Sequence, residues 1–127
     1  IVAGELASED PDKFYGKSQQ VTETDIHLLE TVIDEYTNAL PVIHEFILPG
    51  KSVAGAHLHL ARSVCRRAER LVVKINDETT IRPDLLNYIN RLSDFFYILA
   101  RAEDDYAQKE QLIDTVIERY RQRIEAK

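Results

Sequence analysis

The sequence predicts an all-helical protein built as one bundle, and three observations support this prediction. Apolar residues recur at steps of three and four in three long stretches, which is the period of one face of a helix. No segment alternates apolar and polar residues at period two, as a half-buried strand would. The chain has 127 residues, enough for one core. We therefore treat residues 1–127 as a single helical-bundle domain.

The first segments contain two helical patterns. Residues 1–8 read as the last turns of a helix, and the chain contains no methionine, so we interpret a native N-terminal part as missing. The next helix begins at Thr22, because Thr22 and Asp25 have the spacing of a capping box. It should end by Leu40, because Pro41 disfavours a helical conformation in the residue before it.

The stretch from Ala54 to Ile75 organises the chain. It lacks proline, and its one glycine, Gly55, stands near its start. Apolar residues at three- and four-residue steps predict one buried helix face, formed by Val53, Ala56, Leu60, Val64, Ala68, Leu71 and Ile75.

A second stripe on the same predicted helix is basic. Arg62, Arg66 and Arg70 follow one another at four-residue steps, with Arg67 a quarter-turn away and Glu69 beside the stripe. Like charges at this spacing repel unless an anion lies between them. The stripe is therefore either a face that is solvated or paired with acids, or a polyanion site, because arginine forks match phosphate oxygens. The net charge of −6 favours a local anionic ligand over nucleic acid.

The last part of the chain predicts two further helices. Residues 76–82 form a polar connection, and Pro83 suits the first turn of a helix that has a broad apolar face as far as Leu99. The charged run 101–105 predicts a break or an exposed turn. Residues 105–127 then predict a separate amphipathic C-terminal helix, whose apolar positions are Leu112, Ile113, Val116, Ile117, Tyr120 and Ile124.

Several functional classes find no support in the sequence. Di-iron bundles use Glu-x-x-His pairs, which are missing, and the scattered histidines do not suggest zinc, so we interpret His57 and His59 as packing or interface residues. Cys65 is the one cysteine, and we expect it to be a small buried hydrophobe. No signal peptide or membrane-spanning run is visible, which predicts a cytoplasmic protein without a membrane partner.

Four strings in order resemble the cobalamin adenosyltransferases of the propanediol-utilisation (PduO) type, whose human mitochondrial member is linked to methylmalonic aciduria. The strings are FILPG at 46–50, LHLARSVCRRAER at 58–70, NRLSD at 90–94 and LAR at 99–101. The resemblance extends over about residues 1–104. RRAER and NRLSD at this spacing are specific together, although either alone would be weak.

The resemblance implies a five-helix bundle that assembles as a homotrimer with active sites between subunits. Such enzymes transfer the 5′-deoxyadenosyl group of ATP to cob(I)alamin and release triphosphate, so ATP, Mg²⁺ and cobalamin are the implied ligands. The reduced cobalt supplies the nucleophile. The protein then needs to position ATP, neutralise the leaving triphosphate and hold the corrin. An arginine stripe without a catalytic base is consistent with that chemistry.

The resemblance also implies residue roles. Arg66, Arg67, Glu69, Arg70 and Asn90 match residues that contact ATP, Arg62 matches an arginine of the subunit interface, and Phe46 matches the aromatic residue at the lower face of the corrin. Arg66 and Phe46 are accordingly the expected catalytic residues. From the residues alone, core packing is the alternative for Phe46.

Three departures from the family qualify this interpretation. The N-terminal Gly/Thr-rich ATP loop and the first helix are missing, Lys51 replaces a second glycine, and the segment after Asp105 is longer and more regularly amphipathic than in the family. The alternative function is therefore a non-catalytic helical-bundle module that binds adenosylcobalamin or a partner protein. A nucleotide-binding regulator is a third, weaker alternative.

Overall fold

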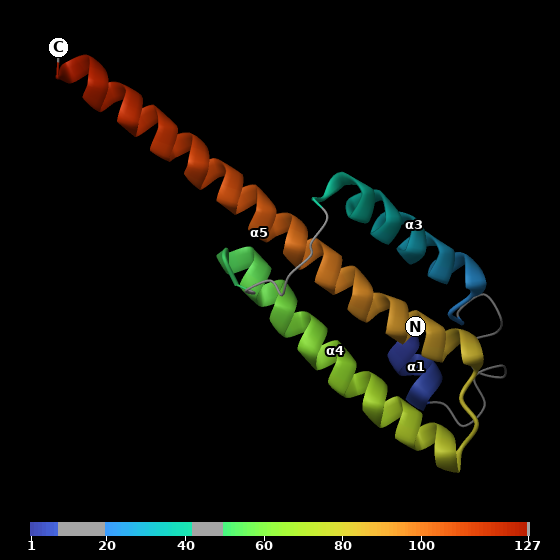
Figure 1. The fold of residues 1–127 in the computed structure, drawn as a ribbon. Helices are drawn as coiled ribbons and strands as arrows, with labels where there is room; N and C mark the ends of the chain where they lie inside the picture. Colours follow the sequence, from blue (N-terminus) through green and yellow to red (C-terminus); the bar gives the residue numbers. More distant parts are fainter. Residues whose placement is uncertain (8–19, 42–49, 127) are drawn as a thin grey trace.

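The computed structural model of the chain describes residues 1–7, 20–41 and 50–126. These residues form four helices and no strand: α1 (Val2–Ala7), α3 (Glu23–Ala39), α4 (Val53–Glu78) and α5 (Pro83–Glu125) (Figure 1). The prediction of an all-helical fold is confirmed.

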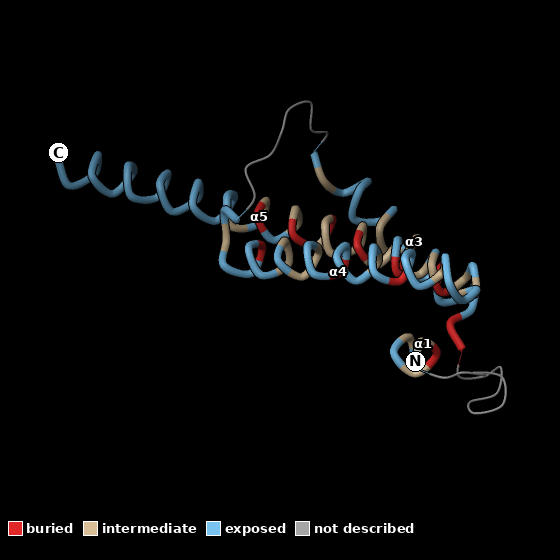
Figure 2. Tube along the Cα trace, turned by 90° about the horizontal axis from the view of Figure 1, so that it is seen from below, coloured by how far each residue is buried: buried red, intermediate tan, exposed pale blue. Residues whose placement is uncertain are grey.

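Helix α5 is the central element of the bundle. It packs against α4 along one side and against α3 along another, and the short α1 lies across one end (Figure 1). The C-terminal half of α5 extends past the other helices, and its residues are exposed from Gln108 onward (Figure 2).

The predicted break at residues 101–105 is wrong. Helix α5 runs without interruption for 43 residues, and its start at Pro83 is as predicted. Neither proline nor glycine follows Pro83, so the backbone meets no residue that would end the helix. Of the charged residues in this run, Asp104 is buried against the start of α4 rather than exposed.

The main core cluster lies where α1, α4, α5 and the residues before α3 meet. Its buried members are Val21, Cys65, Val72, Leu85 and Ile89, and partly buried side chains pack around them. Cys65 therefore has the predicted role of a small buried hydrophobe. Burial, and next to it the charge of Glu69, raises the pKa of its thiol.

The predicted buried face of α4 is wrong for this chain. The residues of α4 that are buried are Gly55, Cys65 and Val72, whereas the exposed fractions of Val53 and Leu60 are 78% and 62%. Helix α5 packs against the neighbouring face of α4. On that face the buried residues Cys65 and Val72 each follow a residue of the apolar stripe by one position. The stripe consequently faces solvent. Helix α1 lies beside it but contributes only the apolar side chains of Val2 and Leu6, at one end of the bundle.

Local chemistry sets the helix starts. The carboxylate of Asp25 accepts hydrogen bonds from the backbone N–H of Thr22 at 2.9 Å and from its hydroxyl at 3.1 Å, as the capping-box spacing predicted. At the start of α4, the Ser52 hydroxyl accepts from the N–H of Gly55 at 2.9 Å. Gly50, just before it, has φ +87°, a conformation that favours glycine.

A buried carboxylate joins α1 to the rest of the bundle. The side chain of Glu5 is 2% exposed, and it accepts two hydrogen bonds from the guanidinium of Arg82, at 3.0 and 3.1 Å. It also accepts from the N–H of Val21, and Arg82 donates to the Val21 carbonyl at 3.1 Å. Three segments distant in sequence thus meet at one ion pair.

We expect Glu5→Gln to lower the free energy of unfolding by about 1–3 kcal/mol, because the half-buried guanidinium of Arg82 loses its charged acceptor and faces an amide N–H. Urea denaturation measures the change. Glu23→Gln is the control, because the Glu23 side chain is 82% exposed, and it should change stability little. Equal stability of the two variants would contradict the role of Glu5.

Candidate functional site

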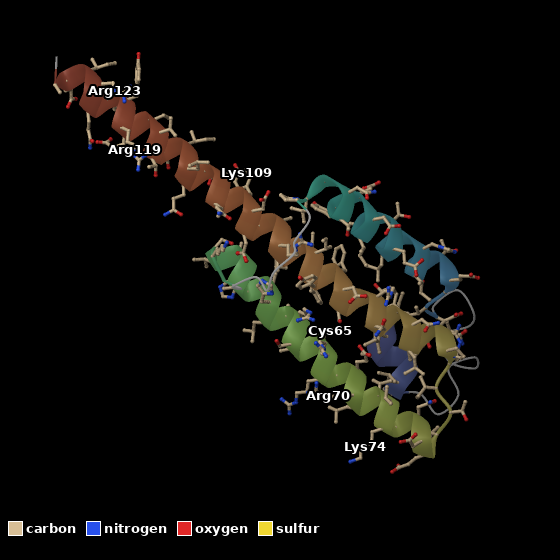
Figure 3. The ribbon with its side chains drawn as sticks, in the orientation of Figure 1. Cys65, Arg70, Lys74, Lys109, Arg119 and Arg123 are labelled. Atoms are coloured by element: carbon tan, nitrogen blue, oxygen red, sulfur yellow. The ribbon has the colours of Figure 1, made fainter. Side chains whose placement is uncertain are left out.

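The arginine stripe lies on the exposed side of α4. Arg66, Arg67 and Arg70 are exposed, and none forms an ion pair within the described parts of the chain. Figure 3 shows Arg70 directed away from the bundle, as is Lys74 one turn later. The described residues therefore offer no acid that neutralises these cations.

Arg62 has different surroundings from the other members of the stripe. It is half-buried, and its guanidinium carbon lies 5.0 Å from the centroid of the Tyr97 ring on α5, which is the range of a cation–π contact. Its Nε is buried without a hydrogen-bond partner among the described residues. Arg62 thus contributes to the contact between α4 and α5, while Arg66 and Arg70 stay accessible.

Two predicted site residues meet across the two helices. The side-chain amide of Asn90 on α5 donates a hydrogen bond to the carboxylate of Glu69 on α4, with a distance of 3.2 Å. The oxygen of the same amide accepts from Arg91, which is paired with Asp94 at 3.0 Å. The structure therefore places Glu69 and Asn90 side by side at an exposed edge of the bundle. Arg66 and Arg70 flank Glu69 in sequence along the same helix.

Phe46 lies outside the described residues, so its predicted place at the corrin is not tested by the structure. The residues at both ends of its segment are described, and each contacts α5.

A polar cluster that the sequence analysis missed surrounds Asp104 at the start of α4. Its Oδ1 accepts from the backbone N–H of Ser52 at 3.0 Å and from the Ser52 hydroxyl at 2.9 Å. Its Oδ2 lies 3.5 Å from Nε2 of His59, which also meets the Tyr97 ring edge-on at a centroid distance of 6.3 Å. His59 therefore has the packing role that we expected, whereas His57 is exposed.

Hydrogen bonding decides the charge state of Asp104. Burial alone would raise the pKa of this carboxyl, but hydrogen bonds from the Ser52 hydroxyl, the backbone of Ser52 and Gly50, and His59 outweigh burial and lower the pKa. Asp104 is thus a carboxylate at neutral pH. The signal that could have revealed it is the uninterrupted helical register, which places position 104 four residues after the buried Ala100.

An apolar groove of about 580 Å³ lies between α1, α4 and α5. Its walls include Leu60 and Val64 of the exposed stripe, Val2 and Leu6 of α1, and Phe96 of α5. The groove thus explains where the apolar stripe of α4 is directed: toward a surface that the described part of the chain leaves uncovered.

The described residues contain no group of three or more His, Cys, Asp and Glu side chains placed to hold a metal ion. Among the helices described, none combines the length and the apolar character needed to cross a lipid bilayer.

Comparison with known proteins identifies the family. The sequence model of the cobalamin adenosyltransferase family matches residues 1–103. The chain belongs to the cobalamin adenosyltransferase family. Over 122 residues it is 43% identical to the corrinoid adenosyltransferase PduO of Citrobacter freundii, which covers 93% of this chain and 35% of that protein. It is also 44% identical to the human corrinoid adenosyltransferase MMAB, over 73 residues. The chain thus spans about a third of the length of each of these two relatives.

Solved structures of adenosyltransferases share the fold. A phenylalanine-to-alanine variant of the PduO-type ATP:corrinoid adenosyltransferase from Lactobacillus reuteri, complexed with cobalamin and ATP, matches with a TM-score of 0.73 and 35% identity. The match covers 85% of this chain and 59% of that one. An arginine-to-lysine variant of the L. reuteri enzyme, complexed with ATP, matches with the same TM-score and 37% identity.

We expect Gly55→Ala to destabilise the helical bundle by about 1–3 kcal/mol, although alanine is the better helix former by about 1 kcal/mol. An added Cβ would lie 2.0 Å from Oδ1 of Asp104 and 2.7 Å from the Ser52 hydroxyl. Thermal unfolding measures the change. In an Asp104→Ala background the closest clash disappears, so Gly55→Ala should cost less there. Additive effects of the two substitutions would contradict the contact.

Proposed function

We propose that this protein is an ATP:corrinoid adenosyltransferase, which transfers the 5′-deoxyadenosyl group of ATP to cob(I)alamin and releases triphosphate. The observation that supports this most directly is the exposed edge formed by α4 and α5. There, arginines without an ion-pair partner among the described residues flank the Glu69–Asn90 contact in a chain of the cobalamin adenosyltransferase family. Relatives with the same fold bind cobalamin and ATP.

The proposed reaction requires that ATP is positioned and that the charge of the leaving triphosphate is neutralised. The cobalt of cob(I)alamin attacks C5′ of ATP, the Co–C bond forms, and the C5′–O bond breaks, leaving its electron pair on triphosphate. Arg66 and Arg70 would hold the phosphates and neutralise the charge that grows on the leaving oxygen. Asn90 would contact the same nucleotide from α5. No side chain needs to act as a base, because no proton is removed in this step.

Mg²⁺ is a further part of the proposal. It binds protein sites through one or two carboxylates together with substrate phosphates. Glu69 supplies a carboxylate between the arginines, and its contact with Asn90 holds it at the α4–α5 edge. Glu69 would therefore help to hold the Mg²⁺ that accompanies ATP.

Phe46 is proposed to face the corrin, where it would exclude a lower axial ligand and make the cobalt easier to reduce. Sequence spacing supports this assignment. The phenylalanine and the arginine that are substituted in the two L. reuteri structures stand 20 positions apart, and Phe46 and Arg66 have the same separation. The first of those structures contains cobalamin and ATP.

An assay with ATP and chemically reduced cobalamin tests the proposed activity. The absorption spectrum measures the adenosylcobalamin that is formed. Adenosylcobalamin formation at a rate that depends on protein concentration would support the enzyme. Binding of adenosylcobalamin without its formation would favour the non-catalytic bundle instead. Phe46→Ala should slow the reaction from cob(II)alamin under reducing conditions without a comparable loss of thermal stability.

We expect Arg66→Ala to weaken ATP binding by roughly ten- to a hundredfold, because a hydrogen bond to a charged group contributes about 1.5–3 kcal/mol. Arg66→Lys retains the charge but loses the bidentate fork, so it should restore only part of the affinity. Calorimetric titration with ATP measures both. Arg119→Ala, which removes an exposed arginine from the far half of α5, is the matched control. Unchanged affinity of the Arg66 variants would remove Arg66 from the site.

The homotrimer is also proposed, with active sites between subunits. The exposed apolar stripe of α4 and the apolar groove beside it are surfaces that a neighbouring subunit could cover. Arg62 has a buried Nε without a partner in the described residues, which is consistent with an acceptor supplied from outside them.

We expect sedimentation equilibrium to give three times the mass of one chain. Leu60→Glu should shift the protein toward monomers, because it places a charge in the stripe that would be buried between subunits. Leu28→Glu introduces the same change at a 66% exposed leucine of α3, outside the stripe, and serves as the control. A wild-type protein that sediments as a monomer at micromolar concentration would contradict the trimer.

A further inference from the structure

We propose that the far half of α5, residues 108–125, pairs antiparallel with the same segment of a second copy of this chain. We call this segment the distal arm. It lies beyond residues 1–103, which match the family model, and the inference does not depend on the proposed enzymatic function. The pairing doubles whichever assembly the bundle itself forms, so it would join two trimers.

The distal arm carries an apolar face that the described part of the chain leaves uncovered. The arm extends past α3 and α4, and each of its residues is exposed (Figure 2). Its large apolar side chains have exposed fractions between 45% and 64%: Leu112, Ile113, Val116, Ile117, Tyr120 and Ile124. A helix in water is stabilised mainly by packing its apolar face, and an uncovered apolar face of this extent marks a contact surface.

The spacing of the apolar residues fits one partner helix. Ile113, Ile117, Tyr120 and Ile124 follow one another at steps of four, three and four, which is the seam of a coiled coil. Leu112 and Val116 border this seam on one side only. The face is thus a narrow line along the arm, which another helix can cover along its whole length.

Charge along the arm identifies that helix as a second copy. Residues 108–118 contain three acids and one lysine: Glu110, Asp114, Glu118 and Lys109. Residues 119–125 contain three arginines and one acid: Arg119, Arg121, Arg123 and Glu125. Figure 3 shows Arg119 and Arg123 toward the free end of the helix. The arm therefore has an acidic half and a basic half, and two arms complement each other when they run in opposite directions.

Parallel pairing lacks this complementarity. It would place the acidic half on an acidic half and the arginines on arginines, and like charges repel. Lys109, the one cation of the acidic half, already forms an ion pair with Asp105 on its own helix, at 2.9 Å. An antiparallel pair has two-fold symmetry, so each favourable contact occurs twice.

The seam also sets the register of the pair. In an antiparallel coiled coil with these seam residues, Ile117 packs against the partner's Tyr120, and Ile113 packs against the partner's Ile124. Asp114 and Arg121 each follow a seam residue by one position, so Asp114 of one copy faces the partner's Arg121. Neither side chain has an ion-pair partner among the described residues of its own chain, and both are exposed.

Sedimentation equilibrium of the full chain, from low to high micromolar concentration, tests the pairing. We expect the mass to double toward high concentration, because one helix per copy makes a small interface of limited affinity. Ile117→Glu should weaken this step by about tenfold or more, because it places a charge in the seam. Thr115→Glu adds the same charge on the opposite side of the arm and is the matched control, which should associate as wild type does.

Exchanging the charges tests the direction. Asp114→Arg and Arg121→Asp should each weaken the doubling by roughly three- to tenfold, because each replaces two attractions by two repulsions. An equimolar mixture of the two variants should recover it, since both contacts between unlike variants then join opposite charges. In a parallel pair these positions do not face each other, so mixing would restore nothing. Circular dichroism of each variant checks that the helix is retained.

The results that would overturn the inference are distinct. A wild-type mass that stays constant at all concentrations would show that the arm does not bind a second copy, and an Ile117→Glu variant that associates normally would exclude the seam. Two charge variants that remain apart when mixed would exclude the antiparallel register. The Leu60→Glu variant, altered in the α4 stripe, should still double its own mass, which separates pairing of the arms from the proposed trimer.

Discussion

The packing of α4 against one continuous α5 is the constraint on which the rest of the structure depends. Helix α5 contacts both α3 and α4, and its first half supplies Leu85, Ile89 and Ile98 to the buried interior. Because the helix does not break after Arg101, Asp104 remains in register to meet the start of α4. A break in the helix at that point would instead place the charged run in solvent. The backbone N–H of Ser52, at the start of α4, would then lose Asp104 as its hydrogen-bond acceptor.

Charged groups in this protein serve two different purposes, and burial separates them. The carboxylates of Glu5 and Asp104 are buried, and they accept hydrogen bonds from Arg82 and from Ser52, which lie in segments distant in sequence. Such groups contribute to a specific arrangement, because removing one partner leaves the other desolvated and unpaired. The arginines at 66, 67 and 70 remain exposed without acidic partners in the described residues, which is the arrangement expected of groups that neutralise a ligand.

Two apolar surfaces remain uncovered within the described residues. One is the α4 stripe beside the groove, and the other runs along the distal half of α5, where Leu112 is 63% exposed and Ile117 45%. Exposed apolar surface of this extent marks interaction sites more often than free surface. The first borders the predicted nucleotide residues and belongs with the proposed subunit contacts. The second belongs with the proposed pairing of distal arms.

The sequence by itself determined the helical class, the start of the helix at Thr22, the start at Pro83 and the buried Cys65, because these depend on local periodicity, capping chemistry and residue type. Its family motifs assigned Glu69 and Asn90 to one predicted nucleotide site, and the structure places these two side chains in contact. Only the tertiary structure decided which face of α4 is buried, because two stripes lie one residue apart on that helix and the choice depends on where α5 packs. It likewise decided the role of Asp104. The charges of residues 101–105 alone predict an exposed segment. The hydrogen bonds that stabilise the buried carboxylate of Asp104 come from residues about fifty positions away, which the local sequence does not reveal.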